Sequence, residues 1–306
     1  MKVRYWGVRG SIPVPGSDTV HVGGNTPCVS VELHDGNLVI IDGGTGLRNL
    51  GRHLLSQPDF AAGNGSAALL ISHRHWDHIH GIPFFEPAYV RGNLFDLYFP
   101  ASASTGDPWR DNAVSMSYSP ANFPVPYADI EAAYRFHTTE ENGVFRVGSA
   151  TIRPVRLNHP GTALGYVISD LHDHDHGGPK VAYLCDTGPW DGPLLGDGMN
   201  GADAPHDGRE TAYRDQVVSA IQGADLVIHD AFFEDGGYEG RAHWGHSSPS
   251  HALSLCRSAG ARRLHLFHFA PDLHDDAVAR MEADARANAD PVEVTAAREG
   301  LEIVLP

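Results

Sequence analysis

A dense group of ligand-type side chains lies near residue 75, in the pattern His73-x-His75-x-Asp77-His78. Imidazole and carboxylate groups are good ligands for zinc and neighbouring transition metals. An alternating His-x-His pair that runs into a helix start can direct two rings at one ion and the following Asp-His pair at another. Because the apolar residues 68–71 lead into the group, a buried strand end is favoured over an exposed polar turn. The spacing therefore allows two metal ions side by side.

Short apolar runs, typical of buried strands, end at polar residues elsewhere in the chain as well. The runs are residues 38–41, 68–71, 181–184, 226–228 and 264–267. The polar residues that follow them include Asp42, Asp186, His229, Asp230 and His268. We expect the C-terminal ends of these strands to meet at one rim, where loops supply the chemistry.

Helical patterns cover residues 215–222, 248–259 and 271–288. Strands mixed with helices, without repeats or a break in composition, favour one layered α/β domain over residues 1–306. Residues 100–130 are rich in Ser, Pro and aromatic side chains and form a candidate lid or insert. The His-rich residues 172–176 indicate a solvated hairpin tip.

The 306 residues include 22 Lys and Arg against 38 Asp and Glu, a formal charge of −16. Such a field repels a long polyanion, so we expect no stable nucleic-acid partner. The three separated cysteines form no disulfide framework, and no apolar stretch is long enough for a membrane span. Residues 1–6 indicate an edge strand rather than a signal sequence. These features predict a cytoplasmic protein that does not enter a membrane.

The motif of residues 73–78 resembles the metal-binding signature of the metallo-β-lactamase fold. The following Gly81-Ile82-Pro83 resembles the branch that contains the tRNA 3′-end endonuclease (ribonuclease Z) and the phosphodiesterase of phosphonate breakdown. The resemblance covers nearly the whole chain and implies a four-layer αββα sandwich. Its further motifs match in order: Asp42-Gly43-Gly44-Thr45-Gly46, Asn158-His159-Pro160-Gly161, Leu184-Cys185-Asp186-Thr187-Gly188, Trp244-Gly245-His246-Ser247-Ser248 and Phe267-His268-Phe269.

The resemblance also implies a role for each ligand-type residue. The implied ligands are His73, His75 and His159 for the first metal, Asp77, His78 and His268 for the second, and Asp186 as the bridge between them. The ions would be two divalent metals, with zinc expected and manganese or iron as alternatives. Two neighbours are set aside, because side chains alternate along a strand. We expect Cys185 to point away from Asp186, and His265 to lie on the opposite face from His268.

His246, in the sequence Trp-Gly-His-Ser, is the predicted general acid. Cleaving a phosphodiester needs a nucleophile, stabilisation of negative charge and protonation of a poor alkoxide leaving group. A hydroxide bridging two ions about 3.5–4 Å apart would supply the first and the ions the second. Because lactam or thioester hydrolysis makes less demand on a protein acid, His246 favours a phosphodiesterase. The predicted catalytic residues are Asp77, His246 and Asp230, with Asp230 orienting His246 or a metal-bound histidine.

We expect the substrate to be a small phosphodiester, with a cyclic nucleotide as the leading candidate. The basic arm with which ribonuclease Z clamps tRNA has no obvious counterpart in this acidic chain. Aromatic residues of the 100–130 segment could stack on a base. A homodimer is expected because members of the implied family often pair. His21 and His80 could line the cleft, whereas His229 and His243 are expected to be structural or surface residues.

Several alternatives stay open on the same fold. One is an RNA hydrolase of the tRNA 3′-end type. Another is an ester, thioester or lactam hydrolase, whose turnover would hardly depend on His246. A di-iron protein that handles oxygen would be coloured and contain iron. A metal-stabilised interaction domain without activity would bind the ions but turn over no substrate.

Overall fold

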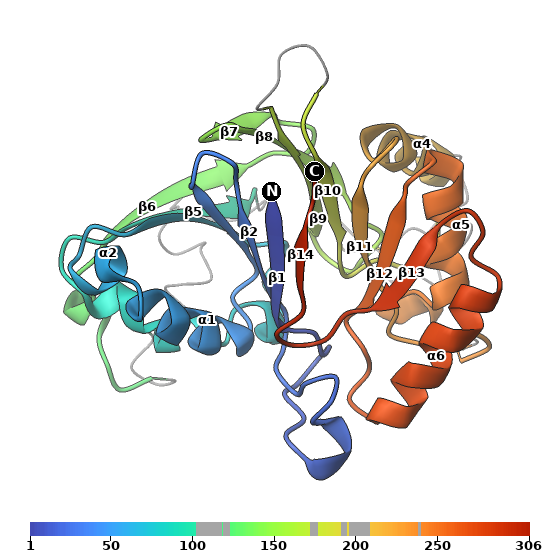
Figure 1. Ribbon diagram of the computed structural model, residues 1–306, viewed down its shortest axis with the longest axis horizontal. Coiled ribbons are helices and arrows are strands. Elements are labelled where there is room, and N and C mark those ends of the chain that lie inside the picture. The colour runs from blue at the N-terminus through green and yellow to red at the C-terminus, as the bar shows by residue number, and fades with distance from the viewer. Residues whose placement is uncertain (102–117, 119–122, 172–176, 191–194, 196–208, 238–239) are drawn as a thin grey trace.

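The computed structural model describes the chain except for residues 102–117, 119–122, 172–176, 191–194, 196–208 and 238–239. Two mixed β-sheets pack against each other, and helices cover the outer face of each sheet (Figure 1). A single cluster of buried apolar side chains joins the sheets, and it includes Val31 from the first and Tyr166 from the second. The predicted four-layer αββα sandwich is therefore confirmed.

The first sheet has the strand order β14-β1-β2-β3-β4-β5-β6. Its strands are β1 (Lys2–Gly7), β2 (Cys28–Glu32), β3 (Leu38–Ile41), β4 (Ser66–Leu70), β5 (Leu94–Pro100), β6 (Ala133–Thr139) and β14 (Glu302–Val304). The prediction of an edge strand at residues 1–6 is wrong, because β14 pairs with β1 and places Ile303 opposite Val3. Local sequence shows that β1 is a strand, but its neighbour comes from the other end of the chain.

The second sheet has the strand order β13-β12-β11-β10-β9-β8-β7. Its strands are β7 (Phe145–Val147), β8 (Ala150–Arg156), β9 (Leu164–Asp170), β10 (Lys180–Leu184), β11 (Leu226–Asp230), β12 (Arg263–Phe267) and β13 (Glu293–Ala296). Strands β10 to β13 run parallel, as β3 to β6 do in the first sheet. The predicted apolar runs are thus strands, and their polar successors stand at strand ends.

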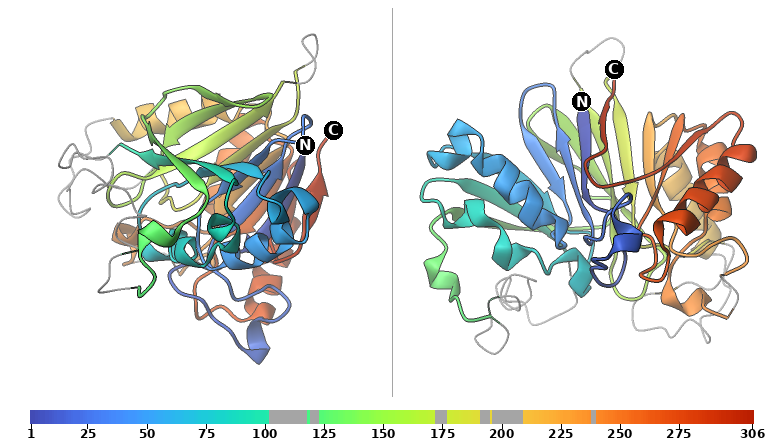
Figure 2. Two further views of the ribbon diagram at one scale, coloured as in Figure 1. Left: turned by 90° about the vertical axis from the view of Figure 1, so that its left-hand side faces the viewer. Right: turned by 60° about the horizontal axis from the view of Figure 1, so that its bottom comes forward.

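Helices α1 (Gly46–Leu55) and α2 (Pro58–Ala61) lie on the side of the first sheet, and α4 (Arg209–Ala220), α5 (Pro249–Ala259) and α6 (Asp275–Ala287) lie on the side of the second (Figure 2). The predicted helix at residues 248–259 is confirmed. Ser248 caps it through a capping box, and Gly260 closes it with a left-handed backbone. No helix of the described residues is long and apolar enough to cross a membrane.

The other two predicted helices exist with shifted ends. α4 begins before residue 215 and ends at Ala220. α6 begins at Asp275 rather than at residue 271, because the preceding segment is held by a tertiary contact. The guanidinium of Arg9, fully buried, donates hydrogen bonds to the carbonyl oxygens of Leu273 and Gly23. This contact fixes the loop after β1 against the start of α6.

Candidate metal centre

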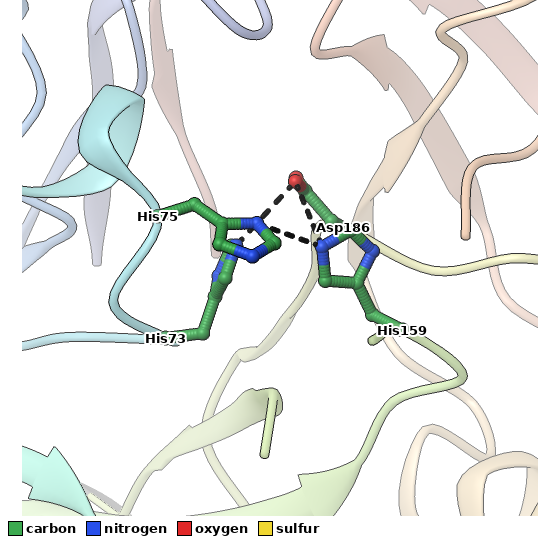
Figure 3. Close-up of side chains that lie close together, drawn as sticks. All are labelled: His73, His75, His159 and Asp186. Carbon is green, nitrogen blue, oxygen red and sulfur yellow. Dashed lines mark hydrogen bonds and ion pairs between the residues drawn. The ribbon is translucent and has the colours of Figure 1, made fainter. Parts of the chain in front are cut away.

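Four side chains from three separate loops form a first group of ligand atoms (Figure 3). His73 and His75 follow β4, His159 follows β8, and Asp186 follows β10. Nε2 of His159 lies 3.0 Å from Nδ1 of His75, and Oδ2 of Asp186 lies 3.6 Å from Nε2 of His73. The four ligand atoms all lie within 4.8 Å of one another. Three imidazole nitrogens and a carboxylate oxygen thus converge.

A second group surrounds the other oxygen of Asp186. Asp77 and His78 belong to the short 3-10 helix η2 (Trp76–His78), and His268 follows β12. Oδ1 of Asp186 lies 3.3 Å from Nε2 of His78 and 3.1 Å from Nε2 of His268. Oδ2 of Asp77 lies 3.3 and 3.0 Å from the same two nitrogens. Asp186 therefore presents one oxygen to each group, as a bridging carboxylate does.

The donor atoms of both groups suit divalent cations. Within the described residues, the buried Nε2 atoms of His73 and His78 make no hydrogen bond. Burial lowers the pKa of His73 well below its ordinary value and that of His159 to about 3, so both rings are neutral and keep a lone pair for a metal. Burial opposes charge on His78 as well, but Asp77 and Asp186 outweigh it and raise the pKa of this ring. The second group thus attracts positive charge.

Asp42 orients His78, a role that was not predicted from the sequence. Oδ2 of Asp42 accepts hydrogen bonds from Nδ1 of His78 at 2.7 Å, from Oγ of Ser72 at 2.8 Å and from the hydroxyl of Tyr183 at 2.7 Å. Oδ1 accepts a fourth, from the Ser72 N–H at 2.7 Å. Because Nδ1 of His78 donates to Asp42, Nε2 is the nitrogen that faces Asp186 and can bind a metal. The position of Asp42 at the end of β3 was the available signal.

His246 and Asp230 form a buried pair beside the second group. Nδ1 of His246 donates to Oδ2 of Asp230 at 2.7 Å, and Oδ1 of Asp230 accepts the N–H groups of Phe232 and Ser247. The Phe232 ring stacks on His246 with centroids 4.3 Å apart. Burial alone would lower the pKa of His246, but Asp230 raises it above its ordinary value. Ligand-type atoms of Asp230, His246, His268 and Asp186 lie within 4.8 Å of one another.

The loop after β1 completes the surroundings of the second group. The backbone N–H of Ser11, whose φ of 65° is left-handed, donates to Oδ2 of Asp77 at 2.8 Å. A Cβ on Gly10 would lie 2.6 Å from the His268 ring, so only glycine fits at this position. No sequence signal indicated that this loop reaches the ligands.

The expectation that Cys185 points away from Asp186 is wrong. Its Sγ lies 2.9 Å from Oδ1 of Asp186, because β10 ends at Leu184 and strand alternation does not continue into the loop. Burial raises the pKa of this thiol well above its ordinary value, so it stays protonated and donates to the carboxylate. His265 does face away from the ligands, and its Nδ1 pairs with the Tyr5 hydroxyl at 2.8 Å. His229, which was expected to be a structural or surface residue, is buried, and its Nδ1 bonds the Asp230 carbonyl oxygen.

Most of the candidate lid, including Trp109, lies outside the described residues, as do residues 172–176. Of its described aromatic residues, Tyr118 is buried and reaches the carbonyl oxygen of Ile82 at 3.4 Å. The Phe123 ring packs edge-on against Phe84 at 5.3 Å. The buried Tyr118 ring is therefore packed in the protein interior and is not exposed for stacking on a base.

A relative of this chain bears the name of a ribonuclease. Ribonuclease Z from Halobacterium salinarum is 28% identical over 271 residues, which are 81% of this chain and 83% of that protein. This likeness confirms the predicted enzyme class, a metal-dependent phosphodiesterase. The prediction of a small-molecule substrate without a nucleic-acid partner is wrong, because the relative is a ribonuclease, whose substrate is a nucleic acid. The net charge describes the whole surface, whereas a cationic centre binds a phosphate locally.

Solved structures share the fold over essentially the whole chain. The metallo-beta-lactamase fold protein YhfI from Bacillus subtilis is 19% identical with a TM-score of 0.65, covering 99% of both chains. The short form of human tRNase Z is 20% identical with a TM-score of 0.63, covering 100% of both. The Beta-lactamase superfamily domain pattern itself matches residues 37–205, more than half of the chain. The structure has two packed sheets and two groups of His and Asp side chains suited to metal binding. Because the family model covers more than half of it, this chain belongs to the beta-lactamase superfamily.

Proposed function

We propose that this protein hydrolyses phosphodiester bonds in RNA at a centre of two divalent metal ions. The observation that carries the proposal is the buried His246–Asp230 pair, 2.7 Å apart, beside the two groups of ligand atoms. An alkoxide leaving group such as a ribose oxygen needs a proton, and this pair can supply it. The relationship to ribonuclease Z supports RNA as the substrate.

In this proposal the first ion is held by His73, His75 and His159, the second by Asp77, His78 and His268, with Asp186 shared. Zinc is the proposed metal, because nitrogen-rich donor sets suit it. When bound, two such ions lower the pKa of a water molecule and offset negative charge on a phosphate. Asp42 and Ser11 keep His78 and Asp77 oriented toward the centre.

His246 acts as the general acid in its protonated form. Asp230 holds Nδ1, so the transferable proton is that of Nε2. The stacked Phe232 ring restricts rotation of the imidazole, and two backbone N–H groups hold Asp230 itself. In the metal-free protein, Asp230 raises the pKa of His246 above its ordinary value, which favours the protonated ring.

The test is an assay of the metal-loaded protein on a tRNA precursor with a 3′ extension, on single-stranded RNA and on cyclic mononucleotides. We expect RNA cleavage that chelation abolishes and added Zn²⁺ restores. Cleavage of carboxylic esters with no cleavage of RNA would instead identify an esterase on the same fold. Elemental analysis and the absorption spectrum separate zinc from the di-iron alternative. The homodimer, the lid and the cytoplasmic location stay predictions.

A further inference from the structure

Two tryptophan side chains next to the candidate metal centre are exposed to solvent. Trp76 is 69% exposed and Trp244 is 45% exposed, whereas Trp6 and Trp190 are buried. A large exposed aromatic side chain presents apolar surface to water. Such surface beside a site commonly contacts a ligand or a partner molecule. The groups around each indole indicate what that partner could be.

Trp76 lies between two ligand residues in the sequence, but its own side chain is not a ligand. It stands between His75, of the first ligand group, and Asp77, of the second, in helix η2. Its ring stacks on His80, with centroids 5.5 Å apart and planes 29° from parallel. His75 points toward Asp186 and His159 (Figure 3), and Asp77 is buried. The Trp76 indole between them is mostly exposed and contacts His80 on one face.

Trp244 comes from a different segment of the chain, the 3-10 helix η6 (Ala242–Trp244) before His246. The next residue, Gly245, has a φ of 76° and accepts a hydrogen bond from Nδ1 of His159 through its carbonyl oxygen. The Phe233 ring lies 6.1 Å from Trp244 and 6.2 Å from His246, and so links the indole to the proton donor. Trp244 is thereby held at the centre from the second sheet.

A cation accompanies the second indole. The guanidinium of Arg241 lies 4.7 Å from the centre of the Phe233 ring and 5.8 Å from that of Trp244. Flat aromatic faces combined with Arg are the features by which proteins bind single-stranded nucleic acid, because any base can stack and the cation attracts the phosphates. In a chain with a net charge of −16 this combination is local to the rim.

We propose that Trp76 and Trp244 are stacking platforms for nucleobases next to the scissile phosphodiester. The proposal rests on the proposed RNA cleavage and adds to it: the indoles select substrates that carry bases. A phosphodiester without bases gains nothing from them. The enzyme thus distinguishes RNA from other phosphodiesters by contacts outside the metal ligands.

The test uses two substrates and two replacements at each position. The substrates are a short single-stranded oligoribonucleotide and the same backbone with abasic riboses, assayed with the metal-loaded protein. Trp76→Leu and Trp244→Leu keep apolar area but lose the aromatic face, whereas Trp76→Phe and Trp244→Phe keep a smaller one. We expect the Leu variants to raise KM about 10-fold or more on the base-carrying substrate, with kcat little changed. The Phe variants should recover most of the loss.

On the abasic substrate all four variants should match the wild type, and metal content should be unchanged. Val144→Ala, at an exposed position between β6 and β7, is the control for loss of exposed apolar area. Equal losses on both substrates, or no loss on either, would overturn the stacking role. A change of oligomeric state with unaltered RNA kinetics would also overturn it and make the indoles a subunit interface. If the wild type cleaves neither oligonucleotide, the proposed function fails and this inference with it.

Discussion

Replacing Asp42 by Asn should weaken one metal site and leave the other intact. In the native protein Asp42 accepts the Nδ1 hydrogen of His78, which leaves Nε2 facing Asp186 and able to bind a metal. The Asn side chain has almost the same shape, but its NH₂ group can donate to Nδ1 of His78. The ring then carries its proton on Nε2, where it blocks metal binding. Of the first group, only His73 is linked to Asp42, and that link is indirect, through the Ser72 hydroxyl. The first group should therefore keep its ion.

The expected magnitude follows from the contacts that change. Loss of a carboxylate that orients a metal-binding histidine costs about 10- to 100-fold in metal affinity, or about 1.4 to 2.7 kcal/mol. Asp42 also accepts from the hydroxyls of Ser72 and Tyr183. An NH₂ group has two hydrogens, and one of them goes to His78, so only one of the two hydroxyls can turn and accept the other. The fold should therefore lose some stability, but less than an Ala replacement would cause.

The assay is a competition titration of the metal-free variant with Zn²⁺ and a chromophoric chelator, followed by elemental analysis. One ion should bind as in the wild type and the second about 10- to 100-fold more weakly. Asp170→Asn is a matched control, since Asp170 is also buried and accepts Nδ1 of a histidine, His34, at 2.7 Å, outside the ligand groups. Two ions bound with unaltered affinity in Asp42→Asn, or equal weakening in both variants, would refute the reasoning.

Four further outcomes are expected. His246→Ala should keep both ions and lose about 10²- to 10⁴-fold in kcat/KM on RNA but little on bis(p-nitrophenyl) phosphate, whose leaving group departs without a proton; equal losses would contradict the acid role. Asp186→Ala should lower the content of both ions, measured by elemental analysis, because each group loses an oxygen ligand. Chelation should lower Tm by several degrees in calorimetry, since ligands from β4, β8, β10 and β12 are no longer tied together. Burial lowers the pKa of His265 to about 4, below the ordinary value of about 6.5, so its contribution to stability is present above pH 6.5 and lost as the pH falls toward 4. When the pH is lowered from 7 to 5, His265→Gln should therefore lose about 2 kcal/mol less unfolding free energy than the wild type, measured by denaturant unfolding of the metal-free proteins.

The chemistry of the centre could be predicted from local sequence patterns. Apolar runs of β-branched residues make strands, and their C-terminal ends place the following residues at one rim. The ligand roles of His73, Asp186 and His268 were implied by the order in which the motifs match those of the family, and in the structure Asp186 lies with His73 in one group and with His268 in the other. The superfamily and the sandwich follow from the same motifs. These features can be predicted because strands and motifs are short segments that the local residue pattern indicates directly.

The contacts that hold those residues, and the groups around them, depend on tertiary structure. Asp42 reaches His78 across 36 residues, the Ser11 N–H reaches Asp77 across 66, and β14 covers β1 from the far end of the chain. The spacing of residues within a short segment does not predict such pairings, because they depend on how the strands are ordered in the two sheets. The direction of Cys185 depends in the same way on where β10 ends. The net charge of the sequence suggested a small substrate. That inference failed because a sum over all residues does not show where charged groups and exposed indoles lie on the folded protein.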